Sequence, residues 1–129
     1  MRASALIFGV LACSGLAQDR PEILPPDFTK PRDVLRIAPR QCQLDRENER
    51  VRVLRLKVNG NEAVPLHDAK DALVICLAKE CHLRLSPPAG RAQEVHMQIA
   101  ETRWINGESR SVANLSSGTL EMLLIEPKP

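Results

Sequence analysis

Cysteine and histidine are the residue types in this sequence best suited to metal binding or nucleophilic chemistry. Beyond the N-terminal segment they are Cys42, His67, Cys76, Cys81, His82 and His96. Local zinc motifs use spacings such as C-x₂-C or H-x₃-H, and none is present here. Cys81 and His82 are adjacent, and neighbours on a strand point to opposite faces, so one ion cannot easily take both. We therefore predict no metal-ligating residues.

The cysteine count predicts one disulfide. Three cysteines remain beyond the N-terminal segment, so one bridge and one leftover thiol is the economical arrangement in an oxidising compartment. Cys42 follows a proline-rich segment that a bridge would pin to the domain, whereas Cys76 lies in the apolar run ALVICLA, where a buried thiol is common. We predict Cys42–Cys81 first and Cys76–Cys81 second.

Recognisable catalytic motifs are missing. The sequence has neither G-x-S-x-G nor a glycine-rich phosphate loop. His67-Asp68 precedes an apolar run, and we interpret the pair as turn and capping residues in a loop. A thiol nucleophile at Cys81 with His82 is the remaining catalytic option, and a disulfide there would remove it. We predict no catalytic residue, no cofactor and no enzymatic activity.

The N-terminus carries two competing processing signals. Residues 1–17 have a basic start, a short apolar core and the small-x-small exit Gly15-Leu16-Ala17, which is typical of a secretory signal peptide cleaved before Gln18. Val10–Cys13, VLAC, resembles instead the lipobox of bacterial lipoproteins, which implies lipidation of Cys13. We predict export to the periplasm or beyond, with a membrane-anchored lipoprotein as the alternative and no transmembrane helix.

Residues 18–40 follow as a proline-rich flexible arm, with one docked piece around residues 34–37. Proline removes backbone donors and favours extended neighbours. A nucleic-acid partner is excluded, because the net charge is only +2 and aromatic residues for base stacking are nearly absent.

Residues 41–129 are predicted to form an all-β domain. VRVLRLKV at residues 51–58 places Leu54, Leu56 and Val58 on one face, with a face switch after Val53 that suggests a bulge or a strand crossing between two sheets. Asn59-Gly60 follows and is typical of a type I′ hairpin turn. With further strands ending near residue 126, we predict about seven strands in a small antiparallel sandwich of immunoglobulin-like or Greek-key type.

A second Asn-Gly pair, Asn106-Gly107, predicts a second hairpin that sets Arg103 against Arg110. We expect both arginines on a solvated face and Trp104 as a cap on the core. These three residues are the candidate interaction surface. Asn114 also begins an N-glycosylation pattern, Asn-Leu-Ser.

The two Asn-Gly segments belong to a weak internal repeat. A shift of 47 residues lays VNGNEAVPLHDAKDALVICLA over INGESRSVANLSSGTLEMLLI without a gap. The repeated unit is predicted to be a hairpin, a loop and a central strand.

The sequence thus favours an exported, non-catalytic binding or structural module that contacts another envelope protein, for example along an edge strand. The alternative is a small-ligand or metal-binding periplasmic protein that uses the Cys/His set, and the third option is a thiol-dependent enzyme.

Overall fold

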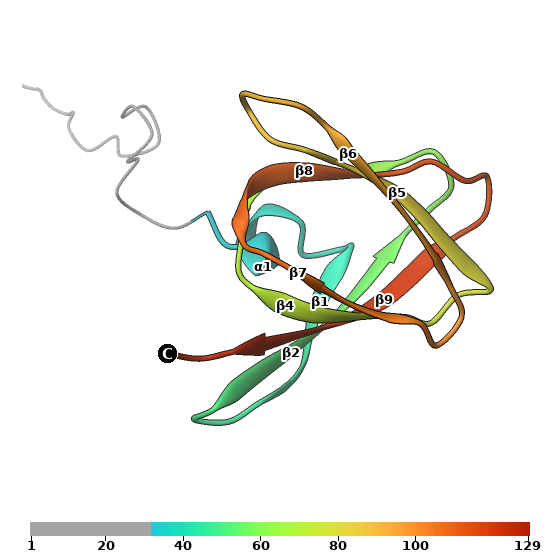
Figure 1. Ribbon diagram of the computed structural model, residues 1–129. Helices are drawn as coiled ribbons and strands as arrows, with labels where there is room; N and C mark the ends of the chain where they lie inside the picture. The colour runs from blue at the N-terminus through green and yellow to red at the C-terminus, as the bar shows by residue number, and fades with distance from the viewer. Residues whose placement is uncertain (1–31) are drawn as a thin grey trace, which may run out of the picture. The chain divides into compact units, whose positions relative to one another are not determined.

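The computed structural model describes residues 32–129 (Figure 1). The predicted signal peptide, the cleavage site, Cys13 and residues 18–31 of the arm lie outside the described residues. Within them no helix is long or apolar enough to cross a membrane. The elements are α1 (Val34–Ile37), β1 (Cys42–Glu47), β2 (Val51–Val58), β3 (Ala63–Ala69), β4 (Ala72–Cys76), β5 (Glu80–Ser86), β6 (Gln93–Gln98), β7 (Thr102–Ile105), β8 (Glu108–Asn114) and β9 (Leu120–Pro127).

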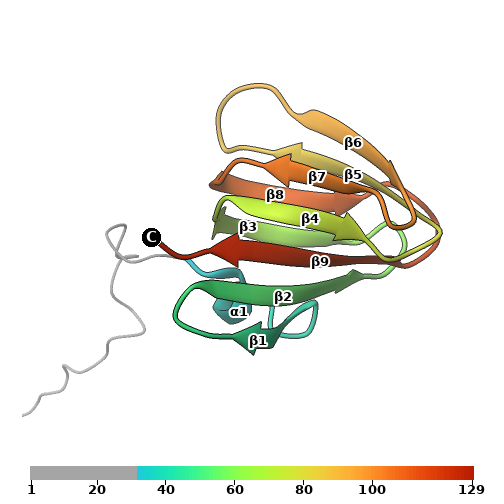
Figure 2. The same cartoon turned by 60° about the horizontal axis from the view of Figure 1, so that its bottom comes forward.

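The strands form two antiparallel sheets that face each other and curve around a common interior, and the two sheets together are called the barrel below. One sheet has the order β1-β2-β9-β4-β7 and the other β3-β8-β5-β6. Figure 1 shows the sheets enclosing the core, and Figure 2 shows their strands running side by side. The predicted all-β, two-sheet architecture is confirmed, with nine strands in the described residues instead of seven.

The two predicted hairpins are wrong. β2 pairs with β1 and β9, whereas β3 pairs with β8 in the other sheet. β7 likewise pairs with β4, and β8 pairs with β3 and β5. Each Asn-Gly pair therefore carries the chain from one sheet to the other, and Arg103 and Arg110 are not cross-strand neighbours.

The glycines in these two connections are required because there is no room for a Cβ atom. Neither Gly60 nor Gly107 has a positive φ, which among the described residues occurs at Asn61, Ala100 and Gly90. A Cβ on Gly60 would overlap the backbone carbonyl of Ser117, and a Cβ on Gly107 would lie 2.6 Å from the carbonyl oxygen of Ala69. Glycine is needed at these two positions because the backbones come close together, and not because the chain forms a type I′ turn there.

The internal repeat corresponds to neighbouring strands. The 47-residue shift takes β3 onto β8 and β4 onto β9, and these are the antiparallel partners that the structure pairs. Gly60 abuts the loop at Ser117, and at the shifted positions Gly107 abuts the loop at Lys70. The repeated unit is thus a sheet-to-sheet connection followed by two strands, arranged about an approximate two-fold axis.

The face switch and bulge suggested for β2 are absent: β2 alternates regularly and stays in one sheet, and the bulge lies in its neighbour β1. The β1–β2 register shifts between Leu44 and Arg46, opposite Leu54 and Val53, so the bulge lies in β1. β2 itself keeps unbroken pairing with β9 along its whole length. Leu54, the first of its three buried aliphatic residues, is fully buried.

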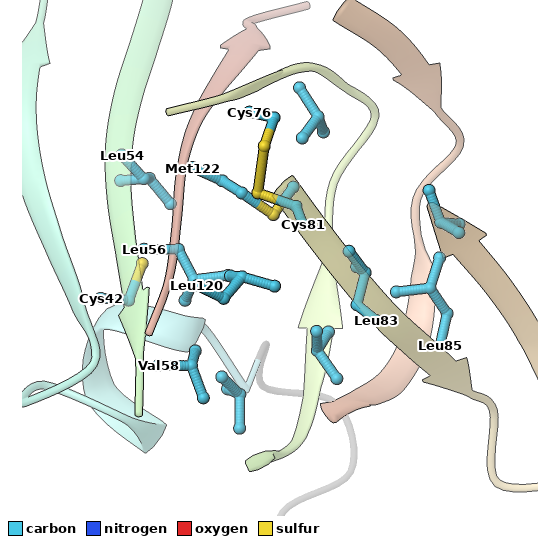
Figure 3. Packing of buried hydrophobic residues seen from close by; sticks show 14 of the residues in the cluster. Cys42, Leu54, Leu56, Val58, Cys76, Cys81, Leu83, Leu85, Leu120 and Met122 are labelled. Atoms are coloured by element: carbon cyan, nitrogen blue, oxygen red, sulfur yellow. A yellow bond between two sulfur atoms is a disulfide. The ribbon is translucent and has the colours of Figure 1, made fainter. Parts of the chain in front are cut away.

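A disulfide joins the two sheets. It links Cys76 at the end of β4 to Cys81 in β5, with 6.0 Å between their Cα atoms (Figure 3). The preferred pairing Cys42–Cys81 is therefore wrong, and the second choice is the one formed. Cys42 is a free, buried thiol opposite Leu56 of β2, where the strand pairing of β1 already ties this end of the domain to the core.

The residues before β1 dock as a single helical turn. The Asp33 carboxylate caps α1 by accepting a hydrogen bond from the backbone N–H of Leu35 at 2.9 Å. Val34 and Ala38 are buried in the core. The docked piece expected at residues 34–37 is present, and its cap brings Asp33 to one end of the barrel.

Candidate functional site

Charged residues close one end of the barrel interior. Alternate residues of β2 and β9 face inward, and this period continues past the aliphatic core to Arg52 and Glu126, which are direct cross-strand partners. Arg52 donates to Glu126 Oε1 and to Asp33 Oδ2, each at 2.8 Å. The side chain of Glu126 is only 7% exposed. The three groups form a satisfied, largely buried ion-pair network.

The pKa values of the two carboxyl groups in this network are shifted in opposite directions. Burial raises the pKa of Glu126 above its ordinary value, and the Arg52 guanidinium partly offsets that rise. For Asp33 the capping hydrogen bond and Arg52 outweigh burial, so its pKa is lowered. Sequence reasoning did not single out these residues, although their place in the inward period of two strands was a usable signal.

His67 and Arg110 form a second buried polar pair. They are cross-strand partners on β3 and β8, after a register shift that follows Val64. Each is only 5% exposed. The prediction that His67 is a loop residue and that Arg110 lies on a solvated face is therefore wrong. The shift near Pro65 turns His67 inward, and β8 faces the core with alternate residues.

Arg110 is incompletely paired. Its Nη1 donates to the backbone oxygen of Asn106 at 2.8 Å and lies 3.6 Å from the Glu108 carboxylate, which is 48% exposed. Its Nε is buried and has no hydrogen-bond partner among the described residues. Burial lowers the pKa of Arg110, yet a guanidinium stays charged at any physiological pH. The interior therefore contains a cation with an unused donor.

His67 is held as a neutral imidazole. Its Nδ1 is 2.8 Å from the carbonyl oxygen of Pro65, and a carbonyl can only accept, so the proton lies on Nδ1. Burial lowers the pKa of His67, and the neighbouring positive charge of Arg110 lowers it further. Nε2 is therefore the acceptor nitrogen of the ring.

Two spaces meet at Arg110. The interior cavity has a volume of about 40 Å³, which is room for a few water molecules, and His67, Lys70, Arg110 and Glu126 are its polar lining residues. The second space is an outer groove of about 300 Å³, near the lower limit for ligand pockets. Its polar and aromatic lining is Gln93, Arg103, Trp104, Asn106, Glu108 and Arg110.

The predicted interaction surface is thus partly a pocket. Arg103, Trp104 and Arg110 all line the outer groove. Trp104 is 50% exposed, so the expectation that it caps the core is wrong. Its ring is held on the rim by a hydrogen bond from Nε1 to Asn106 Oδ1 at 3.0 Å.

The Cys/His set does not assemble inside the barrel. His67 is inside, while His82 and His96 stack on each other outside, on β5 and β6. Residues 32–129 contain no group of three or more His, Cys, Asp or Glu side chains arranged to hold a metal ion. Inside the barrel the cationic Arg110 is the cross-strand partner of His67, and the Glu126 carboxylate is already paired with Arg52. The interior therefore does not fit a metal ion.

The cysteines offer no activated nucleophile in the described residues. Cys81 is bound in the disulfide. Burial raises the pKa of Cys42 to about 12, and Glu126 adds to the rise, so Cys42 stays a protonated thiol.

Asn114 has a structural role. It is only 2% exposed, and its amide nitrogen donates to the carbonyl oxygens of Val58, Asn59 and Gly118. Its Oδ1 accepts from Ser116. The folded domain therefore does not present this asparagine for glycosylation.

Comparison with known proteins identifies the fold. No family model and no curated protein matches the sequence. A cupin-domain protein from Bordetella pertussis superposes with a TM-score of 0.61 at 21% identity, over 68% of this chain and 92% of that one. The fold is that of the cupins. An RmlC-like cupin with a double-stranded β-helix fold from Methanocaldococcus jannaschii gives a TM-score of 0.53 at 15% identity, over 67% of this chain and 77% of that one.

A polyketide cyclase from Streptomyces resistomycificus is also similar, with a TM-score of 0.50 at 22% identity over 67% of this chain and 63% of that one. These likenesses correct the main functional prediction. A non-catalytic envelope module was inferred from an immunoglobulin-like sandwich without a site, but the neighbours are cupins and Arg110 lies between a cavity and a groove. The alternative prediction, a small-ligand or metal-binding protein, agrees better with the cupin neighbours.

Proposed function

We propose that this protein binds a small organic anion, a carboxylate with an apolar body, at the junction of the interior cavity and the outer groove. One observation carries the proposal: the Arg110 guanidinium is buried, and its Nε has no partner among the described residues. A buried donor without a partner costs about 1–3 kcal/mol, and more when the group is charged. A bound carboxylate would supply the missing acceptor.

The contrast between half-buried Arg52 and buried Arg110 supports an anionic ligand. Arg52 has two carboxylate partners at 2.8 Å, so its charge is matched. Arg110 has one backbone acceptor and one longer ion pair, at 3.6 Å, to the half-exposed Glu108 carboxylate, which an incoming ligand can displace. Guanidinium groups bind carboxylates through two parallel hydrogen bonds, which Nε and one Nη can provide together.

The rim of the outer groove suggests what the rest of the ligand looks like. Trp104 presents a half-exposed indole, and Arg103, which is paired with Glu101 at 3.0 Å, lines the same groove. Val95 and Ile105 supply apolar wall. An aromatic carboxylate would place its charge on Arg110 and its ring against Trp104.

Thermal unfolding with added ligands tests the proposal. The probes are acetate, benzoate and inorganic phosphate, added to wild-type protein and to the variants Arg110→Met and Arg103→Gln. Benzoate should raise the wild-type Tm, because a ligand at 100 times its Kd stabilises the folded state by about 2.7 kcal/mol. Arg110→Met should abolish this response, and Arg103→Gln, which removes a rim charge, should only weaken it. An equal response of wild type and Arg110→Met would contradict the proposal.

Export remains a separate proposal. We infer it from the basic start, apolar core and small-x-small exit of residues 1–17, and the disulfide agrees with an oxidising compartment. The intact mass of the mature protein tests it. The proposal requires loss of residues 1–17, or loss of residues 1–12 with a lipid on Cys13.

A further inference from the structure

The outer face of β5 and β6 carries a histidine pair that the proposed ligand site does not use. His82 and His96 are direct cross-strand partners on these antiparallel strands. Their side chains are 36% and 56% exposed, and their rings stack with centroids 4.9 Å apart and planes inclined by 28°. Two imidazoles are thus held side by side in solvent on a rigid sheet.

The spacing of the two rings suits a shared metal ion, although the stacked rings must turn before their nitrogens point at one ion. An imidazole nitrogen binds Zn²⁺ at about 2.0–2.1 Å, which places each ring centroid about 3.2 Å from the ion. Two such rings then lie about 5.2 Å apart in tetrahedral geometry and about 4.5 Å apart at a right angle, as in square-planar Cu²⁺. The observed 4.9 Å lies between these values, so the rings need to turn but the strands need not move.

Each ring also has the carboxylate partner that metal-binding histidines use. His96 Nε2 lies 2.6 Å from Glu80 Oε1, and His82 Nε2 lies 3.1 Å from Glu94 Oε1. A carboxylate that accepts from one ring nitrogen leaves the other nitrogen unprotonated and more basic, which is the usual arrangement around a ligating histidine. Both contacts belong to the stacked pair, and the exposed Glu80 and Glu94 side chains can follow the rings as they turn.

The local charge permits a dication. The negative charges of Glu80 and Glu94 face the positive charges of Lys79 and Arg84, and Arg84 Nη2 lies 3.3 Å from Glu94. No third donor is in place among the described residues, so water would complete the coordination.

We propose that His82 and His96 together bind one divalent transition-metal ion, Cu²⁺ or Zn²⁺, on the outer face of the β5–β6 pair. The inference is independent of the ligand site at Arg110. Bound metal links the edge strand β6 to β5 and stabilises the folded state by RT ln(1 + [M]/Kd), where [M] is the free metal concentration.

Metal titration of the untagged full chain tests this inference. Calorimetry with Cu²⁺ and Zn²⁺ is run on wild type, His82→Gln, His96→Gln and the matched control Arg84→Gln, which changes the same face without removing an imidazole. Each histidine variant should bind at least about tenfold more weakly, since it loses the gain from two linked ligands. Arg84→Gln should bind at least as tightly as wild type, because it removes a competing positive charge.

The electron paramagnetic resonance spectrum of the Cu²⁺ complex supplies a direct readout, since two coordinated imidazole nitrogens split the signal into more superhyperfine lines than one nitrogen does. Circular dichroism establishes that the variants are folded, and both histidines are exposed enough for substitution to be tolerated. The proposal is overturned if wild type and both histidine variants bind Cu²⁺ and Zn²⁺ with equal affinity, or if the spectrum shows fewer than two nitrogens.

Discussion

Replacing Arg110 by methionine should stabilise the ligand-free protein. Arg110→Met keeps a long, unbranched side chain in the barrel but removes the charge and the unpartnered Nε. The matched comparison is Arg52→Met, which makes the same change at a half-buried arginine that is paired with two carboxylates.

The magnitude follows from the partners of each guanidinium. Arg110→Met loses a charged hydrogen bond to Asn106, worth about 1.5–3 kcal/mol, but Asn106 is exposed and water can replace the donor. The Glu108 contact is long and half-exposed and contributes little. The change removes the unpaired donor and the desolvation of a charge, for which apolar replacement is often stabilising by about 1–4 kcal/mol. We expect a net gain of about 1–3 kcal/mol.

Arg52→Met should have the opposite effect. It leaves Glu126 and Asp33 without their cationic partner near the core, and breaking such a buried network costs about 3–5 kcal/mol. Urea unfolding of the two variants and wild type, followed by circular dichroism, gives the free energies of unfolding. In a thermal scan 1 kcal/mol corresponds to about 4–8 °C for a domain of this size. A loss of more than about 1 kcal/mol in Arg110→Met would refute the reasoning, because it would give Arg110 a structural role.

Three further results are expected. The pKa of His67 in the folded protein is lowered below its ordinary value of 6.5, so the unfolded chain binds more protons as the pH falls below 6.5. The free energy of unfolding should therefore decrease as the pH drops from 6.5 through the lowered pKa. His67→Leu should flatten this part of the pH profile measured by urea unfolding, and an unchanged slope would contradict the prediction. The buried Cys42 thiol has a pKa of about 12, so iodoacetamide at pH 8 should label it only after the protein is unfolded. Peptide mass mapping measures the labelling, and rapid labelling of Cys42 in the folded protein would be inconsistent with the burial of this thiol. Gly60→Ala and Gly107→Ala should each lower the free energy of unfolding in urea by about 1–3 kcal/mol, because the added Cβ overlaps backbone atoms. The control Gly118→Ala has open space around the Cβ and should change stability by less than about 0.5 kcal/mol. Equal effects at all three sites would count against the close-contact explanation.

The sequence predicted strands better than it predicted their partners. Period-two patterning located β2 at residues 51–58 with Leu54, Leu56 and Val58 inward, as observed. The Asn-Gly pairs were interpreted through local turn chemistry, which favours hairpins. At both Asn-Gly pairs the consecutive strands instead lie in different sheets, and only the distant backbone at Ser117 explains why Gly60 must be glycine. Contacts between residues far apart in sequence are invisible to a local turn rule.

The candidate site shows the same limit. Arg103, Trp104 and Arg110 were singled out from the sequence, but as surface residues around a hairpin. Arg110 belongs inside because β8 turns alternate residues inward and pairs with β3 at His67. That pairing depends on the register shift after Val64, which no alternation pattern in β3 reveals.

The most direct test of the central claim is a titration of the protein with benzoate, followed through the ¹H–¹⁵N resonance of the Arg110 Nε–H group, assigned with Arg110→Met. If a small carboxylate binds at the unpartnered donor, this resonance moves downfield in the proton dimension and saturates, while that of Arg103 moves less. If the Arg110 Nε–H resonance stays in place at saturating benzoate, or moves linearly without saturation, the assignment of this residue as the ligand anchor is wrong.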